Sequence, residues 1–69
     1  MTNDYEDIPN SAIIRAIDEY VHSERDRVIM KRYLCDDISM FDISLEMGIS
    51  FKTVQRAVIK QEPIIFRHI

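Results

Sequence analysis

The side chains with the clearest chemical use in this sequence lie close together near its carboxyl end. Gln55 and Arg56 are adjacent, Phe51 precedes them by one helical turn, and Lys60 follows Arg56 by another. An arginine can hold a guanine edge with two hydrogen bonds, a glutamine can hold adenine in the same way, and an apolar ring can contact a thymine methyl group. The alternative for Arg56 and Lys60 is a solvated helix face. The Phe51 ring could equally contact a base or pack onto the core as a hydrophobic staple.

Catalytic and metal-binding chemistry finds little support in the rest of the chain. Cys35 with Asp36 and either His22 or His68 could nominally form a nucleophilic site, but no motif surrounds these residues. Two histidines and one cysteine without local spacing do not make a metal site. We therefore expect no enzyme, no cofactor and no bound metal, with Cys35 in the core, His22 in a helix linker and His68 on the surface.

The composition indicates a small helical scaffold for these side chains. The chain has 69 residues, of which 46% are apolar and 30% charged, with one glycine and two prolines. So few turn-forming residues disfavour a sandwich or barrel of short strands. We expect a single compact all-α domain of four helices at residues 10–69, after a mobile acidic arm at residues 1–9.

The cysteine content and the hydropathy of the chain indicate its cellular compartment. The single cysteine excludes an intrachain disulfide framework and indicates a reducing environment. The amino terminus is acidic where a signal peptide is basic, and no apolar run approaches the ~20 residues that span a bilayer. We expect a cytoplasmic protein with no membrane partner.

Charge is distributed unevenly along the chain. The formal net charge is −3, yet residues 1–26 hold seven acidic and two basic side chains, whereas residues 49–69 hold four basic and one acidic. The carboxyl-terminal third could therefore meet an anionic partner that the amino-terminal third avoids. The alternative is a mixed solvated surface.

Serine caps and apolar spacing predict the four helices. Ser23 and Ser39 each stand three residues before an aspartate, which is the spacing of a capping box, and Ser50 can cap in a similar way. Gly48 follows the third helix, where a residue with positive φ is favoured. The helices are expected at about residues 11–21, from the Ser23 cap to about residue 35, at 40–47 and at 51–61.

The carboxyl-terminal tail is too apolar to be a free end. Pro63 is expected to end the fourth helix. Beyond it, four apolar residues are the best candidates for a homodimer contact, with packing on the first helix or pairing as a short strand as the alternatives: Ile64, Ile65, Phe66 and Ile69.

Residues 43–56 (ISLEMGISFKTVQR) resemble the helix-turn-helix of bacterial transcription regulators. The likeness rests on the turn glycine, on the serine cap that follows it, and on apolar residues at Ile43, Met47, Ile49 and Val54. Upstream, residues 23–33 (SERDRVIMKRY) resemble the helix that precedes this motif in region 4 of sigma-70-type factors and in related small phage regulators. The resemblance covers about residues 23–61, with the helix-turn-helix itself at about 39–61.

The resemblance implies roles for the matching residues. In that family the last helix lies in the major groove, while the turn and the preceding helix contact phosphates. The base-facing residues would be Phe51, Lys52, Gln55 and Arg56, and those nearer the phosphates would be Ser39, Ser50, Thr53 and Lys60. Ser44 stands where the family usually has alanine, so its hydroxyl needs a hydrogen-bond partner.

These observations predict sequence-specific binding of double-stranded DNA by a small bacterial or phage-type transcription regulator. The acidic amino-terminal third and the apolar tail favour the alternative, a helix-turn-helix-derived module that contacts a protein such as an RNA polymerase subunit or another regulator. DNA binding by one copy is expected to be weak, because the chain has few cations to release counterions from DNA. Salt-dependent retention on DNA would separate the two functions.

Overall fold

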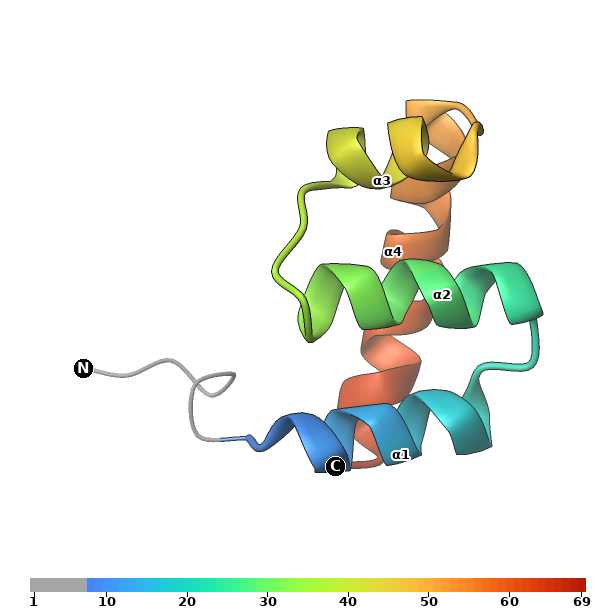
Figure 1. Cartoon of the computed structure of the whole chain (residues 1–69). Helices are drawn as coiled ribbons and strands as arrows, with labels where there is room; N and C mark the ends of the chain where they lie inside the picture. Colours follow the sequence, from blue (N-terminus) through green and yellow to red (C-terminus); the bar gives the residue numbers. More distant parts are fainter. Residues whose placement is uncertain (1–7) are drawn as a thin grey trace.

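The computed structural model of the chain describes residues 8–69, which form four α-helices joined by short loops (Figure 1). The helices are α1 Asn10–Tyr20, α2 Glu24–Leu34, α3 Met40–Met47 and α4 Phe51–Arg67. No strand occurs within residues 8–69, and the expected all-α, four-helix class is confirmed. The first three helices match their predicted ranges to within a residue, whereas α4 is longer than expected.

Serine caps begin three of the helices. In each, the serine hydroxyl oxygen accepts the backbone N–H three residues later, at 3.3 Å for Ser23, 3.1 Å for Ser39 and 3.1 Å for Ser50. Each bond satisfies one of the amide groups that the first turn of a helix leaves unpaired. The prediction of these three caps is confirmed.

The start of α1 differs from the other three. Its N-cap is Pro9, in an extended conformation and without a side-chain cap. Ile8 is half-buried and packs against the core. The predicted arm at residues 1–9 falls outside the described residues except for Ile8 and Pro9, and Pro9 is exposed. The expected boundary at residue 10 stays a prediction.

The loop between α3 and α4 depends on a left-handed residue. Gly48 has φ 66° and ψ 33°, and its N–H and that of Ile49 both donate to the Ser44 carbonyl. No atom lies within 4 Å of the position that a Cβ on Gly48 would take. The backbone conformation, rather than a lack of space, therefore favours glycine here.

α4 continues through Pro63 to Arg67, so the prediction that Pro63 ends the helix is wrong. A proline inside a helix removes the hydrogen bond to the carbonyl four residues earlier, here that of Ile59. Ile59 and Pro63 are both exposed, so this carbonyl lies on the solvent side, where water can satisfy it. Beyond the proline, Ile65 is fully buried, and its burial holds the last turns of α4 on the domain.

The core lies where α4 runs across the other helices (Figure 1). α4 contacts α1, α2 and α3, whereas α1 and α3 do not contact each other. Eleven buried apolar side chains form the core: Ile13, Ala16, Ile17, Val21, Ile29, Met30, Ile43, Val54, Ala57, Val58 and Ile65. Cys35, expected in the core, is only half-buried because it caps the exposed carboxyl end of α2. None of the helices in residues 8–69 combines the length and the apolar composition that crossing a membrane requires.

Candidate nucleic-acid interface

α4 has one buried face and one open face. The buried face consists of Val54, Ala57, Val58, Gln61 and Ile65. The open face consists of Lys52, Arg56, Ile59, Lys60 and Pro63. Because residues three and four apart in a helix lie on the same side, Lys52, Arg56 and Lys60 are aligned over a length of about 12 Å.

Most residues expected to face bases are exposed. Lys52 and Arg56 lie on the open face of α4, and Phe51, in its first turn, is 42% exposed. Gln55, also expected to face bases, is half-buried, unlike Arg56. Its position one turn after Phe51 places it at the edge of the open face, where the neighbouring elements cover part of it.

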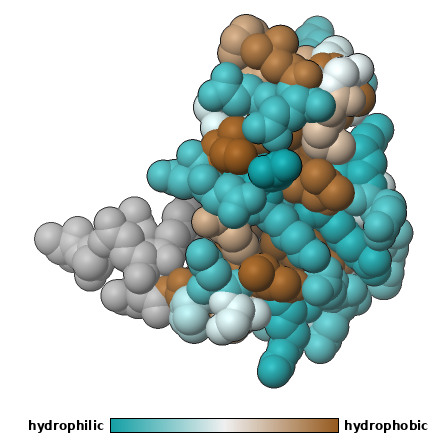
Figure 2. Space-filling view, viewed as in Figure 1, coloured by the Kyte–Doolittle hydropathy of each residue, from teal (hydrophilic) through white to brown (hydrophobic). Residues whose placement is uncertain are grey.

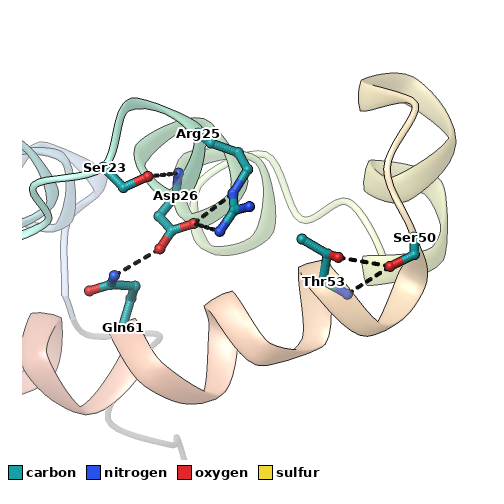
Figure 3. A network of polar contacts seen from close by, with 6 residues as sticks. All are labelled: Ser23, Arg25, Asp26, Ser50, Thr53 and Gln61. Atoms are coloured by element: carbon teal, nitrogen blue, oxygen red, sulfur yellow. Dashed lines mark hydrogen bonds and ion pairs between the residues drawn. The ribbon is translucent and has the colours of Figure 1, made fainter.

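The residues expected near phosphates are divided between the open face and the helix caps. Lys60 is exposed on α4. Ser39 and Ser50 are also exposed, but their oxygens accept backbone N–H groups, and Thr53 is half-buried with its hydroxyl 2.8 Å from that of Ser50 (Figure 3). Ser39 and Ser50 mark the amino termini of α3 and α4, the helix ends that carry partial positive charge.

The cations of α2 and α4 differ in their ion pairing. All four cations of α2 are paired: Arg25 with Asp26 at 3.1 Å, Arg27 with Glu24 at 3.5 Å, Lys31 with Asp18 at 2.9 Å, and Arg32 with Asp36 at 3.7 Å and Glu46 at 3.5 Å. Within residues 8–69, none of the four cations of α4 has an ion pair: Lys52, Arg56, Lys60 and Arg67. The positive charge of α4 is therefore available to a partner.

A buried polar contact holds α4 against α2 (Figure 3). Gln61 donates through Nε2 to Asp26 Oδ2 at 2.9 Å, and both residues are buried. Arg25 donates through Nε and Nη2 to Asp26 Oδ1, each at 3.1 Å. Both carboxylate oxygens thus have partners, and the carboxylate does not return to the Ser23 cap as a capping box requires. Sequence reasoning missed this contact, although the position of Gln61 on the apolar stripe of α4 is a signal for it.

The outer side of α3 is both apolar and acidic. Phe41 and Leu45, one turn apart, are 59% and 65% exposed, and Asp42 and Glu46 are exposed beside them. Figure 2 shows hydrophobic surface at the end of the molecule where α3 lies. Leu45 thus lies on the outer face of α3. Ser44, on the inner side, donates its hydroxyl to the Phe41 carbonyl at 2.6 Å and so finds its expected partner within α3.

The four apolar residues of the tail differ in burial. Ile65 is fully buried, Ile64 and Phe66 are half-buried, and only Ile69 is exposed. Ile64, Ile65 and Phe66 belong to α4, and just beyond its end the centroid of the His68 ring lies 3.7 Å from that of the Tyr20 ring of α1. Ile65 is therefore covered by the domain itself, whereas the homodimer contact of the tail stays a prediction.

Residues 8–69 contain no group of three or more histidine, cysteine, aspartate or glutamate side chains placed to hold a metal ion. Comparison with models of protein families, with curated proteins and with solved structures gives no match. The case for a function rests on the chain's own residues.

Proposed function

We propose that this chain is a small bacterial or phage-type transcription regulator that binds double-stranded DNA with α4 in the major groove. The observation that carries the proposal is the open face of α4, whose cations have no ion pair within residues 8–69, while every cation of α2 has one. Charges left without a protein partner on one aligned face can bind the phosphates and base edges of a duplex. Such a regulator acts in the cytoplasm of its host cell.

The order of residues along α4 suits this role. Phe51, Lys52 and Arg56 lie in the first two turns, the part of a recognition helix that contacts base edges. Lys60 lies one turn beyond Arg56, closer to where the helix leaves the groove and nearer the phosphate backbone. Arg56 is the residue best suited to sequence discrimination, because its guanidinium can bind guanine with two hydrogen bonds.

The buried contacts of α4 keep this face rigid. Val54, Ala57 and Val58 fix its inner side in the core, and Gln61 ties it to Asp26 of α2. A helix held in this way presents its side chains in one orientation, which reduces the ordering cost of binding. The rest of the chain is acidic, with a net charge of −3 overall, so a single copy should bind weakly.

The experiment is selection of bound sequences from a randomised duplex library, followed by fluorescence anisotropy of the selected and scrambled duplexes at two salt concentrations. We expect enrichment of a defined site and a loss of affinity at the higher salt concentration. The matched control is Arg15→Ala on α1, which removes a cation that also lacks an ion pair within residues 8–69 but lies on a helix that does not contact α3. No retention of the wild type on any duplex at low salt, or equal losses for Arg15→Ala and Arg56→Ala, would reject the proposal.

The second candidate function is that of a protein-interaction module, acting on a polymerase subunit or another regulator. The observation that favours it is the exposed apolar pair Phe41 and Leu45, since an apolar group on a surface commonly marks an interaction site. This function predicts no salt-dependent DNA retention and a loss of partner binding when Leu45 is made polar. The anisotropy experiment therefore separates the two.

A further inference from the structure

The most exposed large apolar side chains of residues 8–69 are all on α3 and α4. Phe41, Leu45 and Ile59 are 59%, 65% and 67% exposed, while the other exposed ones reach no more than 46%. Phe41 and Leu45 share one side of α3, and Ile59 lies between Arg56 and Lys60 on the open face of α4. Two neighbouring helices thus each offer an apolar contact that the fold leaves uncovered.

The same two helices carry opposite charge. Residues 36–48, which include α3, hold four carboxylates and no lysine or arginine, whereas the open face of α4 is cationic. Glu46 is paired with Arg32, but the Asp42 carboxylate has no ion pair within the described part of the chain. Arg56 has none either, so an unneutralised acid and an unneutralised base lie on adjacent helices without meeting each other.

We propose that a second copy of this chain docks on this surface, with α3 of each copy against the open face of α4 of the other. Phe41 and Leu45 of one copy then cover Ile59 of its partner copy, and Asp42 pairs with Arg56. α3 and the start of α4 lie at the same end of the molecule (Figure 1). A two-fold axis at that end therefore makes both contacts twice, as a self-complementary interface requires.

This surface is small, since α3 is only eight residues long, so the dimer is weak and forms at high protein concentration. It also covers Arg56, so that the dimer and a duplex bound through α4 exclude each other. Self-association is measured without DNA, and it stands or fails independently of the proposed function.

The first experiment is analytical ultracentrifugation of the chain from about 10 µM to about 1 mM, a range suited to the affinity of a small interface. We expect a concentration-dependent monomer–dimer equilibrium that Leu45→Ser weakens roughly tenfold or more. The matched control is Val28→Ser, on an exposed apolar residue of α2, which should leave the equilibrium unchanged. A strict monomer at every concentration, or equal effects of the two substitutions, would overturn the proposal.

The second experiment tests the pairing by charge reversal. Asp42→Lys and Arg56→Glu should each weaken self-association at least roughly tenfold, because each places like charges together at both contacts of the dimer. An equimolar mixture of the two variants should associate again, since their mixed dimer has one wild-type pair and one reversed pair, both attractive. Association of either variant alone at the wild-type level, or no recovery on mixing, contradicts the pairing.

The control for charge reversal is Glu19→Lys, the same kind of change on α1, which does not contact α3. It should leave the dimer intact. Circular dichroism melting of each variant excludes unfolding, which is not expected because Asp42, Leu45 and Arg56 are all exposed. If DNA binding is established, adding duplex to the dimer should release monomer–DNA complexes, whereas a duplex bound equally by intact dimer contradicts the shared surface.

Discussion

The contact between Asp26 and Gln61 should contribute measurably to stability, and Gln61→Leu tests this. The substitution keeps the side-chain volume close to that of glutamine but removes the donor that lies 2.9 Å from Asp26 Oδ2. A hydrogen bond to a charged group contributes about 1.5 to 3 kcal/mol, and the carboxylate is buried, so water does not replace the lost bond readily. Because Arg25 still bonds the other oxygen, we expect a loss in the middle of this range, about 2 kcal/mol.

Thermal and urea unfolding followed by circular dichroism measure this loss. For a domain of this size, about 2 kcal/mol corresponds to a decrease in Tm of roughly 8 to 16 °C. The matched control is Gln55→Leu, the same chemical change at a half-buried position of α4, which should alter the free energy of unfolding by less than about 0.5 kcal/mol. The double variant with Asp26→Leu and Gln61→Leu should recover part of the loss, because no carboxylate oxygen remains buried without a donor. If Gln61→Leu is as stable as Gln55→Leu, the contact does not hold α4 and the reasoning fails.

Three further predictions concern DNA binding, capping and the thiol. Arg56→Ala should weaken binding to the selected site by about 1 to 3 kcal/mol and binding to scrambled DNA only slightly. Lys60→Ala should weaken binding to both duplexes alike and reduce the salt dependence of binding. If Arg56→Ala weakens binding to both duplexes equally, Arg56 does not read bases. Ser50→Ala should lower the free energy of unfolding by about 1 kcal/mol in urea titrations, since it removes the cap of α4, and an unchanged midpoint would contradict that role. Burial, and secondly the neighbouring Asp36 carboxylate, raise the pKa of the Cys35 thiol, so alkylation by iodoacetamide near neutral pH should be slower than that of a cysteine in an unfolded peptide. The alkylation rate of Cys35 should rise only at a higher pH than that of the peptide cysteine. A faster reaction of the folded chain than of the peptide would contradict the raised pKa of Cys35.

Local features of the chain were sufficient to predict where most helices begin and end. Ser23, Ser39 and Ser50 cap the helices that they were expected to cap, and Gly48 adopts the positive φ for which it was singled out. These features depend on hydrogen bonds and backbone conformations within a few residues. For that reason the four-helix class and the alignment of Lys52 with Arg56 and Lys60 on one side of a helix followed from spacing alone.

Contacts between distant residues decided the rest. The local sequence predicts that Pro63 ends the helix, yet α4 continues to Arg67. The burial of Ile65 in the core outweighs the loss of one hydrogen bond on the solvent side of the helix. Asp26 has the spacing of a capping-box residue, yet its carboxylate bonds Gln61, which is 35 positions away. Two ion pairs of α2, Lys31 with Asp18 of α1 and Arg32 with Glu46 of α3, also arise from helix packing. The other pairs of α2 join residues at most four positions apart, whereas these contacts between helices depend on how the helices pack, which no rule of local spacing contains.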